Sequence, residues 1–294
     1  MERINITSGR HSAFYTPLIF TIAGGFLEAE GLEPHYDPAP SPDEVARRLT
    51  SGEFHLSQLA VSRNWGWLEQ SQTPPILHFA QINERDGFFL AGREPDPDFN
   101  WRSLEGSQAI IDHGGQPLAM FKYACKKKGV DFDMIKVIDA GSAAEMDKAF
   151  RAGRGAYVHL QGPGPQQIEH DGVGHVVASV GEAIGPIAFS SLAATPAWLG
   201  TDMARAFMRA YSTARQELSQ RPAAEVARIE AAHFPGIDRE VLGATIAFYQ
   251  RSGAWAPAVR ISEASYEVAL DVFLSAGLIS KRHDYRACVA EPPA

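Results

Sequence analysis

A pattern of apolar and polar segments occurs twice along the first half of the chain. In the first copy, apolar runs and amphipathic periods predict a strand, a helix, a strand, a helix and a strand. These elements are expected at Arg3–Arg10, Ala13–Glu30, Leu32–Asp37, Ser41–Gly52 and Phe54–Ala60. About a hundred residues later the same order returns, at Gln108–Gly115, Leu118–Lys128, Lys136–Ile138, Ser142–Gly153 and Ala156–Leu160. Two such units facing each other predict a cleft between two lobes, where small ligands bind.

The remaining pattern places further strands around the second copy and helices after it. Strands are expected at Ile76–Ile82, Gly87–Ala91 and Val173–Ser179, and helices at Thr201–Ser219, Pro222–His233, Asp238–Arg251 and Ser262–Ala276. Strands that alternate with helices predict an α/β fold with parallel sheets. A loop rich in Pro and Asp, Gly92–Asn100, separates the two copies.

Composition and charge narrow the class of protein. The chain has 294 residues, of which 45% are hydrophobic and 21% charged, as in a globular protein of two domains. Its net charge of −8 argues against nucleic-acid binding, because phosphate backbones select basic surfaces. No secretory signal is present in the chain as given, which predicts a cytoplasmic protein, or a periplasmic one if an export signal was removed.

Residues that commonly carry metals, cofactors or covalent chemistry are sparse. The two cysteines, Cys125 and Cys288, are distant in sequence and predict neither a disulfide nor a metal site. The histidines lack zinc-site spacing, and the chain contains no Walker loop, no Gly-x-Gly-x-x-Gly and no Gly-x-Ser-x-Gly motif. The sequence therefore predicts no cofactor and no metal.

The first candidate site is the loop Ser8–Ser12, between a strand and the start of a helix. Ligands in open α/β sheets bind beyond the carboxyl ends of the strands, so loops in such positions are the candidates. Free N–H groups at the helix start favour an anion, and Ser8, Arg10 and His11 add donors. The alternative is a tight turn in which Ser12 caps the helix.

The second candidate is the loop Asp112–Pro117, in the matching position of the second copy. Gly114 and Gly115 let the backbone approach a ligand closely, and Gln116 follows them at the start of a helix. Asp112 could orient His113 for acid–base work. A plain surface turn explains the same residues equally well.

Two further loops end the third strand of each copy and are expected to face each other. They contribute Gln58 and Ser62 from one side and His159 and Gln161 from the other, and Gln81 ends another strand. All five are neutral hydrogen-bonding groups. Three aromatic residues could form an apolar wall of the cleft or belong to the core: Trp65, Trp67 and Phe79.

Several of these segments together resemble a known family. The carrying residues are Ile4–Arg10 with Pro17–Gly31, the step Leu49–Leu56, and Trp101–Gly106 followed by Ala109–Gly115. They are similar to the periplasmic-binding-protein-like family that includes sulfonate-, nitrate- and thiamine-pyrimidine-precursor-binding proteins.

The resemblance implies a two-lobe type II fold that closes on its ligand by a hinge motion. Lobe 1 would comprise 1–88 and 190–294, and lobe 2 would comprise 89–189, with crossovers near Asp86–Gly92 and Gly181–Leu192. It also implies the substrate-binding subunit of an ABC importer, with a permease as partner. Some relatives of the family are enzymes that use a cysteine or a cysteine-rich motif, and this chain has neither at the matching positions.

Three functions remain open from the sequence. The first is a solute-binding protein that captures a small organic ligand, anionic or heteroaromatic, in the interlobe cleft. The second is an enzyme of lyase or hydrolase type on the same scaffold, with Asp112, His113 and His159 in acid–base roles. The third is a cytosolic ligand sensor without a transporter.

Overall fold

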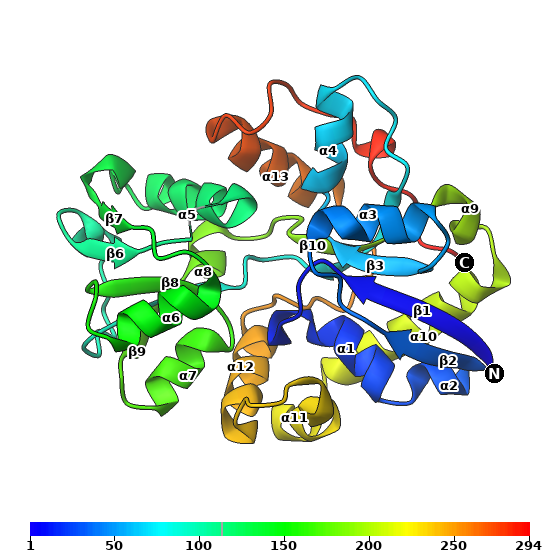
Figure 1. Ribbon diagram of the computed structural model, residues 1–294, viewed down its shortest axis with the longest axis horizontal. Helices are drawn as coiled ribbons and strands as arrows, with labels where there is room; N and C mark the ends of the chain where they lie inside the picture. The colour runs from blue at the N-terminus through cyan, green and yellow to red at the C-terminus, as the bar shows by residue number, and fades with distance from the viewer. Residues whose placement is uncertain (113) are drawn as a thin grey trace.

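The structure is a computed structural model that describes residues 1–112 and 114–294. Two five-stranded sheets lie side by side, each flanked by helices, and both ends of the chain lie on the lobe of the first sheet (Figure 1). The first sheet has the order β2-β1-β3-β10-β4. Its strands are β1 Glu2–Ser8, β2 Leu32–Tyr36, β3 Leu56–Leu59, β4 Leu77–Asn83 and β10 Ser190–Ala194.

The second sheet has the order β7-β6-β8-β5-β9. Its strands are β5 Phe88–Gly92, β6 Gln108–Ile110, β7 Lys136–Ile138, β8 Tyr157–Gln161 and β9 His175–Ser179. The chain therefore passes from the first sheet to the second between β4 and β5 and returns between β9 and β10. The architecture is the α/β, two-lobe arrangement that the sequence predicts.

The expectation of purely parallel sheets is wrong at one strand in each lobe. In the first sheet β10 pairs antiparallel with both β3 and β4, and in the second β5 pairs antiparallel with both β8 and β9. These are the two strands that follow a crossing between lobes. A strand that enters a sheet from the other lobe is not the second strand of a βαβ unit within its own sheet, so the usual reason for parallel pairing is missing.

The expected long helix Ala13–Glu30 is divided into three pieces: a 3-10 turn Ala13–Tyr15, α1 Thr16–Ala23 and α2 Phe26–Ala29. The break lies at Gly24 and Gly25. Gly25 has a φ of 80°, in the left-handed region that glycine tolerates best, and it begins α2. The apolar periodicity runs through both helices, which is why the pattern alone does not show the break.

The other helices surround the two sheets. In the first two thirds of the chain they are α3 Pro42–Thr50, α4 Ser62–Glu69, α5 Gly115–Lys127, α6 Ala143–Arg151, α7 Gly164–His170, α8 Val180–Ile184 and α9 Pro196–Leu199. The last third holds α10 Asp202–Leu218, α11 Ala223–Glu230, α12 Arg239–Arg251 and α13 Glu263–Ser275. Short 3-10 turns lie at Trp101–Leu104, Phe132–Met134, Ala231–His233 and Tyr285–Ala287.

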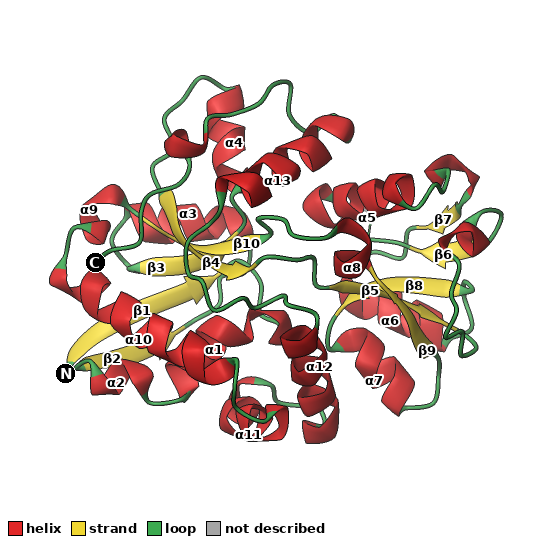
Figure 2. Cartoon of the chain, turned by 180° about the vertical axis from the view of Figure 1, so that it is seen from behind, coloured by secondary structure: helices red, strands yellow, loops and turns green. Residues whose placement is uncertain are grey.

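Helices of the last third join the two lobes. Seen from behind, α10, α11 and α12 lie below the first sheet and α13 lies above it (Figure 2). Contacts between α12 and α7, and between α13 and α5, connect these helices to the second lobe. Within the described ranges, no helix has an apolar stretch long enough to cross a bilayer.

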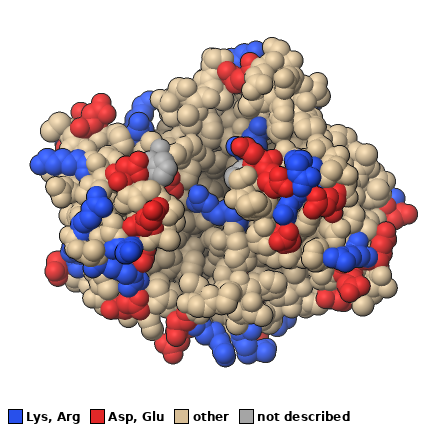
Figure 3. Space-filling model, in the orientation of Figure 1, with Lys and Arg blue, Asp and Glu red and all other residues tan. Residues whose placement is uncertain are grey.

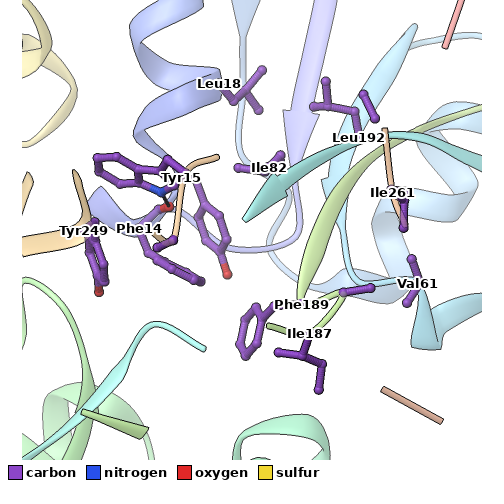
Figure 4. Close-up of a cluster of buried hydrophobic side chains, with 14 of the residues drawn as sticks. Phe14, Tyr15, Leu18, Val61, Ile82, Ile187, Phe189, Leu192, Tyr249 and Ile261 are labelled. Carbon is purple, nitrogen blue, oxygen red and sulfur yellow. Dashed lines mark hydrogen bonds between the residues drawn. The ribbon is translucent and has the colours of Figure 1, made fainter. Parts of the chain in front are cut away.

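A hydrophobic core continues beneath the region where the lobes meet. Figure 4 shows Phe14, Tyr15 and Tyr249 grouped on one side, with Phe189 and Ile187 from the returning crossing opposite them. These side chains are buried, and the Phe14 and Tyr249 ring centroids are 4.9 Å apart. Aromatic packing of this kind stabilises the region where the chain crosses between the lobes.

Candidate ligand-binding cleft

A cleft of about 500 Å³ lies between the two lobes. It is formed by the loops after β1 and β3, the end of β8, the 3-10 turn Ala13–Tyr15, the two crossings, and residues of α3, α4, α5 and α13. The space-filling view shows a hollow between the lobes with basic side chains at its floor (Figure 3). Its lining residues are Gly9, Arg10, Tyr15, Asp43, Gln58, Leu59, Ala60, Ser62, Arg63, Gly66, Trp67, Gln70, Phe88, Gly115, Gln116, Pro117, Gln161, Phe189, Ser190 and Phe273.

Arg10 enters the cleft from the loop after β1, and Gln58 holds that loop in place. The Gln58 Oε1 accepts a hydrogen bond from the Arg10 backbone N–H at 3.2 Å, and its Nε2 donates to the Ser190 Oγ at 2.5 Å. The Gln58 carbonyl also accepts from the Gly9 N–H at 3.1 Å. Because both ends of its amide are occupied and it is only 4% exposed, Gln58 positions Arg10.

Arg10 supplies a positive charge to the cleft without forming an ion pair with a described residue. The other arginine in the lining, Arg63, pairs with Asp43, which also lines the cleft. Arg10 has no carboxylate within ion-pair distance anywhere in the part of the chain that the structure describes. A guanidinium offers several N–H donors in a plane that suits a carboxylate, sulfonate or phosphate group.

Aromatic side chains enclose the space around Arg10. The Arg10 guanidinium carbon lies 5.8 Å from the Phe88 ring centroid, on the second lobe. Tyr15, Trp67, Phe189 and Phe273 add further aromatic surface. A flat apolar ligand body fits such walls, because aromatic faces stack well on other rings.

A side-chain hydrogen bond crosses the cleft and joins the lobes. The Ser62 Oγ, at the start of α4 in the first lobe, donates to the Gln116 Oε1, at the start of α5, over 3.1 Å. The Gln116 Nε2 then donates to the Phe189 carbonyl at 3.2 Å. Both ends of the Gln116 amide therefore form hydrogen bonds, the oxygen with the first lobe and the nitrogen with the crossing that returns to it.

The cleft brings together half of the residues that the sequence singles out. Arg10, Gln58, Ser62, Gly115, Gln116 and Gln161 line it. Gln161 lies beside the Tyr15 hydroxyl, and burial raises the pKa of that tyrosine above its usual value. Gly114 lies next to the lining but not in it, and its N–H donates to the Asp112 Oδ1 at 3.2 Å.

Ser8 and His11 belong to the loop Ser8–Ser12 that carries Arg10, but they do not line the cleft. The Ser8 Oγ and the Tyr36 hydroxyl are 2.9 Å apart, and that hydroxyl is 2.9 Å from the His11 Nδ1. The His11 Nε2 lies 2.7 Å from the His233 carbonyl oxygen, which requires a proton on that nitrogen. This chain of bonds ties the loop to the turn after α11.

Gln81 forms its hydrogen bonds within the first lobe and does not line the cleft. Its Nε2 donates to the Ala258 carbonyl at 2.8 Å, and its own carbonyl accepts from Tyr211 and Arg215. Among the three expected wall residues, Trp67 lines the cleft, whereas Trp65 and Phe79 are fully buried in the core.

His159 lies beneath the cleft and not on its surface. Its ring is fully buried, stacks on Phe88 with the centroids 4.7 Å apart and lies tilted against Phe121 at 4.8 Å. Neither ring nitrogen has a partner among the described residues. Burial, with a smaller contribution from Arg10, lowers the pKa of His159 to about 3. A neutral, enclosed imidazole does not reach a ligand as a proton donor. His113 lies outside the described residues.

Several lining residues were not singled out from the sequence. Phe88 and Phe189 sit at the two crossings, which the sequence did locate, so their position beside a hinge was the available signal. Asp43, Arg63 and Phe273 come from helices, which the strand-end rule does not cover. Across residues 1–112 and 114–294, no group of three or more His, Cys, Asp or Glu side chains could hold a metal ion.

Solved structures share this architecture over nearly the whole chain. The ligand-binding component of an ABC-type import system from Staphylococcus aureus, with zinc bound, superposes with a TM-score of 0.76 at 16% identity, covering 99% of this chain and 97% of that one. The periplasmic aliphatic sulphonate binding protein SsuA from Escherichia coli gives 0.74 at 16% identity, covering 99% and 93%. These likenesses show the periplasmic-binding-protein fold.

Sequence comparisons place the chain in a family. The protein named "Putative binding protein YtlA" from Bacillus subtilis (strain 168) is 27% identical over 296 aligned positions, which cover 98% of this chain and 88% of that protein. The profile of the family described as "NMT1/THI5 like" matches residues 13–225, well over half of the chain. The chain therefore belongs to the NMT1/THI5-like family.

Proposed function

We propose that this protein is a solute-binding protein whose ligand is a small organic anion with a flat aromatic or heteroaromatic body. The observation that carries the proposal is Arg10, a cation without an ion-pair partner among the described residues, in an interlobe cleft walled by aromatic rings. The anionic group would lie at Arg10 and the ring between Phe88, Phe189 and Trp67. Gln161 and Ser190 would supply directional hydrogen bonds.

The names of similar proteins support this role. One is a ligand-binding component of an ABC-type import system, and another is a sulphonate-binding protein. By analogy, an ABC permease would receive the ligand, and the protein would work in the periplasm or outside the cell. The two sheets support a lobe 1 of residues 1–88 and 190–294 and a lobe 2 of residues 89–189, except that Phe88 pairs with Gln161 and so belongs with the second sheet.

Thermal stabilisation by candidate ligands tests the proposal. Ligands that bind only the folded state raise the melting temperature. The panel holds benzenesulfonate, benzoate, a pyrimidine carboxylate and an aliphatic sulfonate, each against its uncharged amide or alcohol. We expect aromatic anions to stabilise the protein and their uncharged counterparts to have no effect. A panel in which no anion raises the melting temperature would contradict the proposal.

Arg10→Gln and Arg205→Gln form a matched pair for this test. Both remove one positive charge, but Arg205 lies on α10, where it pairs with Asp202, and does not line the cleft. We expect Arg10→Gln to lose affinity by 100-fold or more, roughly the loss of a charge-assisted bidentate hydrogen bond. Arg205→Gln should bind as the unchanged protein does.

A further inference from the structure

A second charged group lies at the hinge behind the cleft. Asp86 belongs to the segment that joins β4 to β5, where the chain first crosses between the lobes, and it is 3% exposed. Its Oδ1 accepts a hydrogen bond from the Phe88 N–H at 2.6 Å. Its Oδ2 has no partner among the described residues. An enclosed carboxylate oxygen without a donor is costly, which favours a proton on this group.

The surroundings of Asp86 are tightly packed. On one side Gly181, in α8, lies so close that a side chain there would collide with the Asp86 backbone carbonyl. On the other, the Tyr249 hydroxyl donates to the Gly87 carbonyl at 2.7 Å. Tyr15 and Tyr249 lie close enough to Asp86 to interact with it electrostatically. Water therefore has little access to Asp86, and nearby charges act on it through protein.

Arg10 is the charge that acts on Asp86. The loop after β1 contributes Arg10, while the turn Ala13–Tyr15 and α12 contribute Tyr15 and Tyr249, whose pKa values burial raises, so that both are neutral. The one charged side chain of α8, Glu182, is exposed. Along the chain, Glu84 and Arg85 are half-buried, and the Arg85 Nη1 points to the Gly181 carbonyl.

Burial raises the pKa of Asp86 to about 7, against the opposing effect of the Phe88 N–H and of Arg10. Near neutral pH this carboxyl therefore exchanges its proton with solvent. Its two states give the cleft two different electrostatic fields, because ionised Asp86 offsets part of the Arg10 charge and protonated Asp86 does not.

We propose that Asp86 couples anion capture to proton uptake: an anion bound at Arg10 drives a proton from solvent onto Asp86, and protonated Asp86 in turn strengthens anion binding. This coupling rests on the proposed function, since it requires an anion at Arg10. It makes the affinity of the cleft a function of pH even for a ligand whose own charge is constant.

The direction of the coupling follows from linkage. Anion and ionised Asp86 are like charges that share one arginine, so each weakens the other by the same factor. Affinity is therefore highest below the pH at which Asp86 ionises and falls as pH rises through it. Coupling energies between sites in proteins correspond to factors of about 5 to 150, and we expect roughly a tenfold loss between pH 6 and pH 8.5.

The first experiment needs no ligand. Carboxyl carbons of aspartate are labelled with ¹³C, and the Asp86 resonance, assigned with Asp86→Asn, is followed by NMR from pH 5 to pH 9. We expect a midpoint near neutrality in the unchanged protein and a higher midpoint in Arg10→Gln, which removes the favourable cation. Asp86 that titrates below pH 5, or at the same pH in both proteins, would overturn the proposal.

The second experiment measures the proton directly. Benzenesulfonate, which keeps one negative charge throughout this range, is titrated calorimetrically in two amine buffers of different ionisation enthalpy. We expect a fraction of a proton to be taken up per ligand at pH 7.5 and none in Asp86→Asn, whose affinity should be the same at pH 6 and 8.5. Asn keeps the acceptor for the Phe88 N–H, so the hinge can retain its geometry.

Glu94→Gln serves as the control, because it removes a negative charge from an exposed position just after β5. It should take up protons as the unchanged protein does. Binding without proton uptake in the unchanged protein, or uptake that survives in Asp86→Asn, would refute the coupling. If benzenesulfonate does not bind, the proposed ligand class is contradicted, while the ligand-free titration still decides whether Asp86 and Arg10 are coupled.

Discussion

Glu230 is a carboxyl group enclosed in the first lobe at the end of α11, with no exposed surface. The Thr16 Oγ1 lies 2.9 Å from its Oε2 and 2.8 Å from the Ala13 carbonyl oxygen. A hydroxyl has one hydrogen to donate, so it cannot serve both oxygens. If Thr16 donates to the carbonyl, Glu230 must donate to Thr16, which requires a protonated carboxyl. Burial, which raises the pKa of Glu230 well above its usual value, favours the same state.

Replacing Glu230 by Gln should stabilise the protein, and more so at higher pH. The unfolded chain loses this proton near pH 4.5, whereas the folded chain, with its raised pKa, keeps it to higher pH. The free energy of unfolding therefore falls as pH rises between these two pKa values. Gln cannot ionise and can still donate to Thr16. We expect a gain of about 1–3 kcal/mol in the free energy of unfolding at pH 8 and less at pH 5, from urea denaturation at both pH values.

The matched control is Glu225→Gln, on the same helix but exposed. Its effect on the free energy of unfolding should be small and nearly independent of pH. A Glu230→Gln protein less stable than the unchanged one at pH 8 would show that the carboxylate is ionised and stabilising there.

The loop Ser8–Ser12, which carries Arg10, shows how far a residue pattern can predict which side chains contact a ligand. Arg10 was identified because it follows a strand and precedes a helix, and position along the chain is enough for that inference. His159 was also expected at a strand end, but it lies inside β8, and its side chain packs beneath the cleft between the Phe88 and Phe121 rings. Gln161 lies two residues further along the same face of the strand and does line the cleft, so the distance from the strand end decides between ligand contact and burial. Sequence alone does not fix that choice.

At the scale of elements, the break between α1 and α2 shows where local and long-range preferences conflict. Gly25 adopts a φ of 80°, and a Cβ there would meet no atom within 4 Å. The cost of a side chain at this position is therefore backbone strain and not crowding. The apolar pattern had predicted one helix, because it records which face is buried and not where the axis turns.

Two glycine substitutions separate these effects. Gly25→Ala should lower the free energy of unfolding by about 1 kcal/mol, since alanine is disfavoured in the left-handed region. Gly243→Ala, inside α12, should raise it by about 0.5–1 kcal/mol, because alanine favours the helix and its Cβ would come no closer than 3.8 Å to a neighbour. Urea denaturation measures both. If both substitutions changed the free energy of unfolding in the same direction, backbone conformation would not be the deciding factor.

The hydrogen bond between α4 and α5 is the second element-scale feature that the sequence did not show. Ser62 and Gln116 were each predicted as ligand contacts, but they also contact each other. Their pairing depends on how far the lobes are closed, and no local pattern encodes that distance. The two crossings, in contrast, were expected from the resemblance to the periplasmic-binding-protein-like family.

Gln116→Ala should favour more open lobes in the absence of ligand. It removes hydrogen bonds to both Ser62 and Phe189, each contributing about 0.5–1.5 kcal/mol to the closed arrangement. Spin labels on cysteines placed at the exposed positions Thr50 and Lys148 report the interlobe distance by pulsed electron resonance. The two native cysteines are buried and should resist labelling. We expect a longer mean distance in Gln116→Ala.

Ser62→Ala is the partner variant, because it removes only one of the two bonds. It should give a smaller increase in distance, and adding it to Gln116→Ala should change little further, as expected for residues that act together. Independent, additive increases would show that the two side chains do not form a single connection across the cleft.

At the scale of the whole molecule, histidine burial makes the protein sensitive to acid. Burial lowers the pKa of His11, His55, His78, His159 and His233. Each is therefore protonated more readily in the unfolded chain than in the folded one. The contribution of these histidines to stability is complete above 6.5, the pKa of histidine in the unfolded chain, and is lost as pH falls below that value. Because the five histidine effects share one sign, they add to one another, and they oppose the effect of the raised pKa values of Asp86 and Glu230.

His159 should account for a measurable share of this acid sensitivity. Its pKa falls from 6.5 to about 3, so at pH 4 the unfolded chain holds a proton at this position that the folded chain lacks. The loss between pH 7 and pH 4 is about 3 kcal/mol for one such group. In His159→Leu, which has a similar volume and cannot titrate, the free energy of unfolding should fall less steeply over this range.

The slope with pH, and not stability at one pH, is the quantity to compare, because Leu also loses the stacking on Phe88 and Phe121. Urea denaturation at pH 7, 6, 5 and 4 gives that slope. His170→Gln, at an exposed position on α7, is the control and should leave it unchanged. If His159→Leu and the unchanged protein lose stability in parallel, then His159 takes up its proton in the folded state. That result would require water to reach the ring between Phe88 and Phe121, and so would also weaken the case for a dry, low-dielectric floor beneath Arg10.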